Sequence, residues 1–251
     1  MSTETITTEQ ARAQSLREAE NKAIELFDLI SKDLIRPGIT EKQLSDEIHQ
    51  LGETTCHVRT HWHKRLVRSG PNTLSPFHDN PPTRTIQPGD ILVIDLGPVF
   101  EEWEADFGRT YVLPEENSSS SNTTTTTTVI DATKQKLQLR DALEPMWWKI
   151  KRLYDRNPSM TGGELYNLAL QTAAEDGWDW GATQIAGHIV GDFPHERIPR
   201  DKVTNYITEG NQQRMDEVDS KGNRRHWILE VHLRPKGAEF AGFFEQLLTV
   251  D

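Results

Sequence analysis

Apolar residues at helical spacing dominate the start of the chain. From about Glu9 to Leu34 they recur every three or four positions, and Pro37-Gly38 ends the pattern. A second helix is predicted to begin at Thr40, because Gln43 three residues later completes a capping box ahead of another apolar stripe. The chain therefore opens with two amphipathic helices, each of which needs a surface to cover.

The pattern then changes from helical to extended. Residues 56–88 are rich in His, Arg, Pro and Asn and show no sustained period, which predicts short strands joined by long loops. Ile91 to Leu96 is a nearly continuous apolar run between Pro88-Gly89 and Gly97-Pro98, as is typical of a buried strand. We expect Asp106 to Leu113 to be its partner strand.

The second half of the chain resembles the first. A third helix is predicted from about Asp131 to Tyr154, and a fourth from Thr161, where Glu164 completes another capping box. The segment Pro37 to Leu44 matches Pro158 to Leu165, and strands follow each of them. This repeat indicates two similar α+β halves. A chance match between two stereotyped helix starts is the alternative.

Between the halves lies a stretch of Asn, Ser and Thr at 117–128, whose composition cannot supply a core. We expect a disordered surface insert there. The predicted organisation is one domain over residues 1–251, with a first half at about 9–115 and a second at about 131–251.

Composition and charge exclude several classes of protein. The 28 Lys and Arg residues against 39 Asp and Glu give a net charge of −11, which disfavours binding to phosphate backbones or anionic lipid. No apolar run approaches the roughly 18 to 20 residues of a membrane helix, and no secretory signal pattern opens the chain. We expect a cytoplasmic protein without nucleic-acid or membrane partners. Because Cys56 is the single cysteine, any metal must be held by His and carboxylates.

Carboxylates inside apolar strands are the strongest chemical signal. Asp95 closes the run from Ile91, Glu230 lies in Trp227 to His232, and Glu245 follows Phe243-Phe244. A buried carboxylate must be paired or bound to a cation, although any single one is more often structural.

Further ligand types accompany these strands. Asp106 begins the next strand, His188 lies just after Gly187, and His195 follows seven residues later. Four carboxylates would neutralise two divalent cations, and oxygen ligands with one imidazole suit Mn, Co, Fe or Zn without choosing among them.

Taken in order, the pattern resembles that of the pita-bread metallopeptidases, which include methionine aminopeptidases, aminopeptidase P, prolidase and creatinase. The family pattern is Asp, ten residues, Asp, then Gly-His, then two Glu residues in strands. Asp106 to Thr110 is similar to the family's Asp-x-x-Arg-Thr. His78 and His195 lie where the family keeps catalytic histidines. The five matching ligand positions are Asp95, Asp106, His188, Glu230 and Glu245.

The resemblance implies an α+β pita-bread fold, with two pseudo-symmetric halves and a curved antiparallel sheet flanked by helices. It implies that Asp95 chelates one metal, that Asp106 and Glu245 bridge both, and that His188 and Glu230 hold the second. A metal-bridging hydroxide would be the nucleophile. His78 or His195 would stabilise the oxyanion or pass a proton to the leaving amine.

Two departures bear on the substrate. Gln184 stands where aminopeptidase P and prolidase have a histidine, and Phe243 stands where they have an arginine, which argues against proline-directed specificity. No substrate-binding residue is assigned. The loop from His61 to Arg65 and the segment from Asn211 to Asp219 are candidates to line the pocket, with solvated loops as the alternative.

Three functions remain open. The leading hypothesis is a two-metal aminopeptidase or dipeptidase acting on a short peptide or peptide-like metabolite. A creatinase-like hydrolase of a small non-peptide C–N substrate is the second, and a non-catalytic binding protein on the same fold is the third. A homodimer is a further expectation, with Trp147-Trp148 as the interface patch.

Overall fold

A seven-stranded antiparallel sheet forms the centre of the molecule. The computed structural model describes residues 8–115, 123–181, 183–195, 203–219 and 221–250, and the side chains of the third helix from residue 132 onward. Six strands follow one another across the sheet, and β8 (Gly187–Val190) pairs beside them with β9. Their order is β2 (Leu66–Ser69), β3 (Ile91–Leu96), β6 (Phe107–Val112), β10 (Gly242–Leu247), β9 (His226–Arg234) and β7 (Asp179–Trp180).

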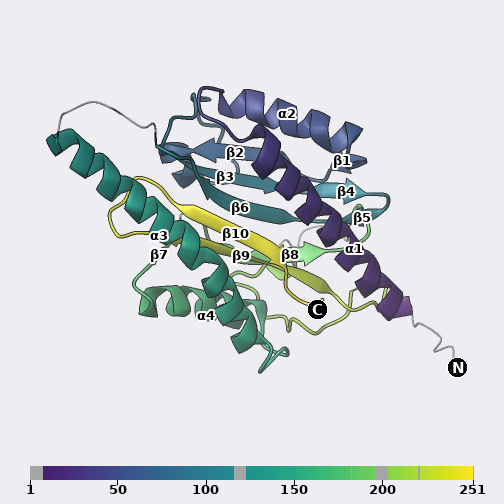
Figure 1. Ribbon diagram of the computed structural model, residues 1–251. Helices are drawn as coiled ribbons and strands as arrows, with labels where there is room; N and C mark the ends of the chain where they lie inside the picture. The colour runs from purple at the N-terminus through teal and green to yellow at the C-terminus, as the bar shows by residue number, and fades with distance from the viewer. Residues whose placement is uncertain (1–7, 116–122, 182, 196–202, 220, 251) are drawn as a thin grey trace, which may run out of the picture.

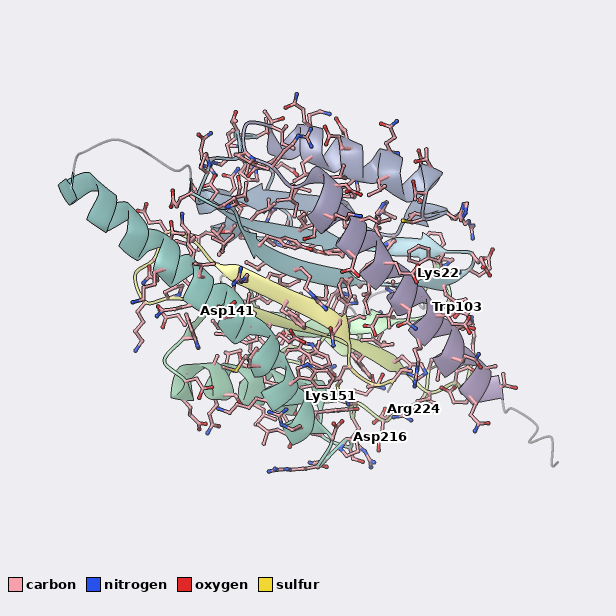
Figure 2. All side chains as sticks on the ribbon, in the orientation of Figure 1. Lys22, Trp103, Asp141, Lys151, Asp216 and Arg224 are labelled. Atoms are coloured by element: carbon pink, nitrogen blue, oxygen red, sulfur yellow. The ribbon has the colours of Figure 1, made fainter. Side chains whose placement is uncertain are left out.

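A small second sheet extends the first half. It contains β1 (Thr60–His61), β4 (Pro98–Phe100) and β5 (Trp103–Glu104), with β4 in the middle. Because β4 follows β3 after Gly97 alone, this sheet grows directly from the end of β3. It packs against the first helix, whose Lys22, labelled in Figure 2, pairs with Glu101 in the turn between β4 and β5.

Four long helices cover the sheet. Figure 1 shows α1 (Thr8–Leu29) and α3 (Thr123–Tyr154) crossing one face of the strands. The helix α2 (Glu41–Thr54) packs beside β2, and α4 (Gly162–Glu175) packs beside β7. Two 3₁₀ turns, at Gly70–Leu74 and Val203–Asn205, complete the regular structure. None of the described helices combines the length and the hydropathy needed to cross a bilayer.

The predicted starts of the second and fourth helices are confirmed. The Thr40 and Thr161 hydroxyls each accept a hydrogen bond from the backbone N–H three residues on, and Gln43 and Glu164 close both capping boxes. The first helix differs at its end, because a π-helical turn replaces α-helix over Ile30–Leu34.

The third helix begins at Thr123, eight residues earlier than the sequence predicts. The helix therefore includes residues 123–128 of the predicted disordered insert. Adding residues to an existing helix needs no new nucleus, so low-propensity threonines can extend it. Residues 116–122 lie outside the described part of the chain.

Alternation along the strands separates the core from the opposite face. On β3, Leu92 and Ile94 pack into a core with residues of α1 and α2. On β9, Leu229 and Val231 pack into a second core with residues of α3 and α4. The intervening residues, such as Asp95, point away from the helices because side chains alternate along a strand. The predicted α+β fold, an antiparallel sheet flanked by helices, is confirmed.

The tryptophan pair of α3 does not form a surface patch. Trp147 is buried in the second core, and its indole N–H donates to the Leu229 carbonyl at 2.9 Å. Only Trp148 is exposed, at 40%. Consecutive helical residues point about 100° apart, so one of two neighbours faces the sheet while the other faces solvent.

Candidate metal centre

Strand register places three carboxylates in one row across the sheet. Asp95 on β3 lies opposite Gly108 on β6, Gly108 lies opposite Glu245 on β10, and Glu245 lies opposite Glu230 on β9. Because Gly108 has no side chain, the Phe243 ring can lie directly over its backbone. A Cβ added there would meet the Phe243 ring.

Asp106 and His188 complete the predicted group. Asp106 precedes Gly108 by two residues, which directs its side chain to the same face. His188, on β8, brings Nε2 to 2.9 Å from Asp106 Oδ2 and to 3.8 Å from one oxygen each of Glu230 and Glu245. The structure therefore brings the five predicted ligand residues together on the face opposite the helices.

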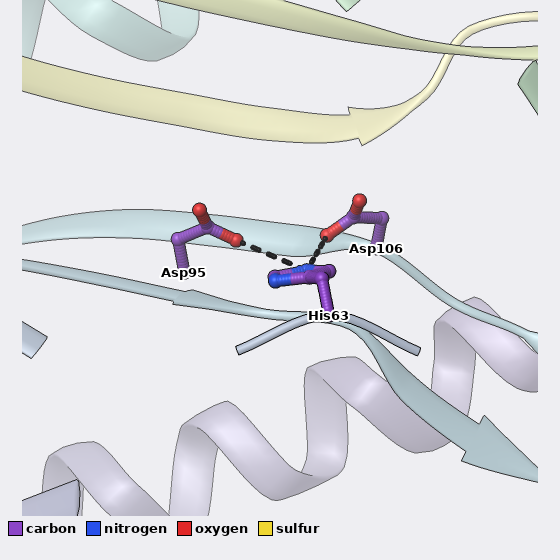
Figure 3. Close-up of side chains that lie close together, drawn as sticks. All are labelled: His63, Asp95 and Asp106. Carbon is purple, nitrogen blue, oxygen red and sulfur yellow. Dashed lines mark hydrogen bonds and ion pairs between the residues drawn. The ribbon is translucent and has the colours of Figure 1, made fainter. Parts of the chain in front are cut away.

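A second imidazole enters the cluster from the other side. His63 Nε2 lies 3.1 Å from Asp106 Oδ1 and 3.6 Å from Asp95 Oδ1 (Figure 3). The sequence indicated the loop from His61 to Arg65 only as a candidate pocket wall. The sequence shows only that His and Arg are frequent in this loop, and this does not indicate which imidazole points into the cluster.

A cavity of about 520 Å³ opens over the cluster. The five predicted residues and His63 contribute to its wall, and much of the remainder is apolar. The apolar and aromatic part of the wall comprises Trp62, Leu66, Leu74, Phe77, Val93, Ile185, Tyr206 and Phe243.

His78 lies at the exposed rim of this cavity. The chain on either side of His78 is held by Arg68. The buried guanidinium of Arg68 donates to the carbonyls of Ser75, Pro76 and Asp79. Each of these carbonyls gains a charge-assisted hydrogen bond, so Arg68 fixes the path of the chain on both sides of His78.

His195 is set back from the cavity. It is not among the described residues that line the wall, and its ring packs against Trp62 with centroids 5.2 Å apart. Its Nδ1 donates to the buried Glu104 carboxylate at 2.8 Å, and Glu104 also accepts from the His195 backbone N–H. Trp62 contacts His188 as well, so this indole lies beside both rings.

The segment from Asn211 to Asp219 does not reach the cavity. None of its described residues contributes to the wall. Asn211 instead accepts at its carbonyl from the Gly163 backbone N–H at the start of α4, and its side chain donates to the Tyr206 carbonyl. This segment supports the second half rather than a substrate.

The second carboxylate oxygen of Glu230 also has a partner. His232, two residues further along the same strand, brings Nε2 to 2.8 Å from Glu230 Oε2. Glu230 therefore keeps one oxygen toward His188 while the other is held by His232.

The Asp-x-x-Arg-Thr motif clamps the strand that carries Glu245. Arg109 donates to the Glu245 carbonyl, and its guanidinium lies 3.7 Å from the ring centroids of both Phe107 and Phe244. The Thr110 hydroxyl donates to one backbone carbonyl of β10 and accepts from the N–H of the same residue. The backbones of β6 and β10 pair at a single position, Gly108 with Glu245. The Arg109 and Thr110 side chains therefore supply hydrogen bonds between these strands that backbone groups would otherwise make.

Crowding of like charges shifts the pKa values of the cluster. Burial raises the pKa of Asp95 to about 7, opposed by His63 and reinforced by Asp106. Burial and the Asp106 charge raise the pKa of Glu245 well above its ordinary value. Burial alone would also raise the pKa of Asp106, but His63 and His188 hold it well below its ordinary value.

The imidazoles respond in the opposite direction. Burial lowers the pKa of His63, but Asp106 and Asp95 outweigh it and raise the value to about 9. Burial likewise opposes protonation of His188, and hydrogen bonds to Asp106 and Glu245 raise its pKa well above the ordinary value. As the side chains stand, two imidazoles provide the positive charge that the carboxylates need.

The donor set fits divalent metal ions. Asp95 Oδ1 and Glu245 Oε2 are buried without a hydrogen-bond partner in the described part of the chain. Two groups of donor atoms lie close enough to share an ion: His63, Asp95 and Asp106 form one, and Asp106, His188 and Glu245 form the other. Buried anionic oxygens without donors are satisfied by cations, and oxygen with imidazole suits first-row divalent metals.

The antiparallel sheet, the helices on one face and the oxygen-rich cluster on the other are typical of pita-bread metallopeptidases. Residues 14–218 match the sequence model of metallopeptidase family M24. The chain belongs to this family, whose members generally bind divalent metals.

Individual relatives agree with this assignment. The chain is 25% identical over 181 residues to an Xaa-Pro dipeptidase of Lactobacillus delbrueckii subsp. lactis, covering 72% of this chain and 44% of that protein. It is 24% identical over 169 residues to an Xaa-Pro dipeptidase of Lactobacillus helveticus, covering 66% and 40%. The chain thus spans less than half the length of these curated relatives.

Solved structures show the same fold. A prolidase from Thermococcus sibiricus superposes with a TM-score of 0.67 at 17% identity, covering 98% of this chain and 59% of that one. A methionine aminopeptidase from Thermotoga maritima gives 0.63 at 16% identity, covering 98% and 99%. The pita-bread fold predicted from the sequence is confirmed.

Proposed function

We propose that this chain is a divalent-metal-dependent hydrolase of amide C–N bonds, acting as an aminopeptidase or dipeptidase on short peptides or peptide-like metabolites. The observation that carries the proposal is the convergence of four carboxylates and an imidazole at the floor of one cavity. Membership in family M24 and the Xaa-Pro dipeptidase relatives support peptide bonds as the target.

Five residues would hold two ions. The ligands are Asp95, Asp106, His188, Glu230 and Glu245, and Mn, Co, Fe and Zn all suit this set. The metal supplies Lewis-acid polarisation of the substrate carbonyl and lowers the pKa of water so that it attacks near neutral pH. His232 and Arg109 orient this set, since one holds an oxygen of Glu230 and the other fixes the backbone at Glu245.

Two histidines, His78 at the cavity rim and His195 behind Trp62, would complete the reaction. Water adds to the carbonyl carbon, the C–N bond breaks, and the leaving nitrogen must gain a proton. His78, at the rim, would donate to the substrate or to the leaving amine. His195 donates from Nδ1 to Glu104, which leaves Nε2 as the atom that would act toward the site.

The cavity wall favours a small and largely apolar substrate. Phe243 takes the place of an arginine, and its ring lies 4.7 Å from that of His232. Arg68, which also lines the cavity, is committed to backbone carbonyls. A substrate carboxylate would therefore find few cationic partners on the described wall, whereas an apolar side chain would find several aromatic ones.

The test is hydrolysis by metal-loaded protein. The full chain, stripped of metal and then supplied with Mn or Co, is assayed against Xaa-Pro dipeptides, other dipeptides, amino-terminal Met peptides and amino-acid amides. We expect release of the amino-terminal residue by the parent and by the control His49→Gln, which changes a half-exposed helix position that does not line the cavity. Glu245→Ala and His188→Ala should be inactive.

Two results would contradict the proposal. Near-parental turnover in Glu245→Ala or His188→Ala would show that the cluster is not the reaction centre. Cleavage of a guanidino compound with every peptide refused would favour the creatinase-like reaction instead.

A further inference from the structure

His63 is carried to the cluster by pairing between distant segments. Its loop joins β1 to β2, and β1 pairs with β4, which directly follows the strand of Asp95. The Trp62 backbone N–H donates to the Gly97 carbonyl at 2.9 Å, so the next residue lies beside the end of β3. Figure 3 shows the His63 ring between the carboxylates of Asp95 and Asp106.

The hydrogen bonds of His63 select the nitrogen that faces the carboxylates. Nδ1 lies 2.7 Å from the Lys64 carbonyl, which can only accept, so Nδ1 carries a proton. In the neutral ring, Nε2 then holds the lone pair, and it is aimed at Asp95 and Asp106. Histidine ligands of metals in proteins commonly donate their other N–H to a carbonyl in this way.

His188 has the same arrangement on the opposite side. Its Nδ1 lies 2.8 Å from the Ile189 carbonyl, again that of the following residue, and its Nε2 faces Asp106. The two oxygens of Asp106 are thus divided, Oδ1 facing His63 and Oδ2 facing His188. The imidazoles are placed equivalently about the central carboxylate.

We propose that His63 Nε2 is a sixth ligand of the metal centre, binding the ion that Asp95 and Asp106 hold. The inference rests on the proposed metal-dependent function and extends its ligand set. His63 is only 7% exposed at its side chain, and Asp95 Oδ1 beside it has no hydrogen-bond partner in the described residues.

The extra ligand has a chemical consequence. A neutral imidazole adds no charge, so four carboxylates and two divalent ions remain balanced. It does add a softer donor to a position otherwise surrounded by oxygen, which favours Zn, Fe or Co over Mn. The rival arrangement keeps His63 as an imidazolium that takes the place of this ion, in which case the protein binds a single metal.

The decisive measurement uses the unmodified full chain. Protein labelled with ¹⁵N-histidine is loaded with ¹¹³Cd, the bound cadmium is counted by mass spectrometry, and long-range ¹H–¹⁵N spectra are recorded. We expect two cadmium ions per chain and two imidazole Nε2 signals with cadmium coupling. His63→Phe should remove one of these signals and His188→Phe the other.

The possible failures are distinguishable. Cadmium bound with a single coupled imidazole, that of His188, overturns the His63 assignment and leaves the proposed function standing. One cadmium per chain in the parent, rising to two in His63→Phe, identifies the imidazolium arrangement and also overturns it. No bound cadmium would overturn the proposed function together with this inference.

Affinity provides a second readout. In cobalt titrations followed by visible absorption, His63→Phe should weaken one of the two sites by at least about 10- to 100-fold, the range for groups that only support a ligand. His49→Gln, which removes a half-exposed imidazole of α2 that pairs with Glu53, should retain both sites. Parental affinity at both sites in folded His63→Phe protein contradicts the assignment.

Discussion

The two imidazoles at the centre face the same carboxylate from very different supports. His188 is part of a strand, and β8 pairs with β9 over four consecutive residues. His63 lies on a loop attached to the smaller sheet by two residue pairs and the Trp62 hydrogen bond. The same contact geometry is therefore built once by a continuous ladder and once by a loop.

The two supports should differ in rigidity. A residue inside a ladder moves only if neighbouring hydrogen bonds break, whereas a loop residue can shift by local backbone changes. We expect the His188 side to be preformed and the His63 side to adapt to its ion. The predictions below test this contrast.

The largest effect should come from removing each imidazole in turn. His188→Ala should lower kcat/KM by more than about 100-fold, because it removes a ligand from the rigid side. His63→Ala should cost about 10- to 100-fold, because water can enter the adaptable loop and replace the ring. Steady-state hydrolysis at saturating cobalt measures both, and equal losses would contradict the contrast.

The next effect concerns two glycines, one before His188 in the chain and one in contact with His63. Gly187 has φ +138°, and a Cβ there would meet the backbone carbonyl of Ile228, so Gly187→Ala should destabilise the protein by about 3 kcal/mol. At Gly97 a Cβ would meet the side chains of His63 and Trp62, which can move. Gly97→Ala should cost only about 1 kcal/mol while weakening metal binding about 10-fold.

Chemical denaturation and cobalt titration on the same samples check this pair. If Gly97→Ala binds both ions as the parent does, then the packing of His63 against Gly97 does not determine its position.

His195 offers a third kind of support, since a carboxylate rather than a carbonyl holds its Nδ1. Glu104→Ala should lower kcat by about 10- to 100-fold, and Glu104→Gln should recover part of the loss because an amide oxygen still accepts from Nδ1–H. Steady-state kinetics of the two variants check this role: a kcat that recovers in Glu104→Gln with KM unchanged supports it, and equal losses in both variants contradict it.

The last effect is confined to stability and lies where the first helix supports the strand of Glu245. Burial raises the pKa of Glu20 to about 7, opposed by the backbone N–H of Leu247 that it accepts from and by Arg109. Glu20 therefore ionises at a lower pH in the unfolded chain than in the folded chain. Its contribution to stability is present below about pH 4.5 and is lost as the pH rises to about 7. Glu20→Gln should stabilise the protein by about 1–3 kcal/mol at pH 8.

The difference between parent and Glu20→Gln should disappear below about pH 4.5, where Glu20 is protonated in both the folded and the unfolded chain. Denaturation curves at pH 4, 6 and 8 measure it, and a constant difference across the series would show that another interaction is responsible.

Much of the site could be predicted because its signals are local. A carboxylate in an apolar strand, as at Asp95, is visible along the chain, and alternation then assigns it a face. Capping boxes at Thr40 and Thr161 likewise depend only on neighbouring residues. These signals lead to the helix starts, the central strands and five residues that the structure brings together.

The remaining features depend on pairing between distant segments. His63 reaches the cluster only because β1 pairs with β4, and nothing within its loop encodes that pairing. The indole of Trp62 lies against His195 for the same reason, so a histidine expected to face the substrate stands behind an aromatic ring. Helix starts are encoded locally, but which loop residue turns inward is decided by tertiary contacts.

Gly108 lies at the midpoint of the centre. Asp95 and Glu245 flank it from strands on either side, so two interstrand steps, about 9–10 Å in all, separate their backbones. That interval is set by backbone hydrogen bonds and is therefore insensitive to what packs around it. A single hydrogen atom in place of a methyl group lets the Phe243 ring lie over the middle strand, across an interval whose width the peptide ladder fixes before any ligand arrives.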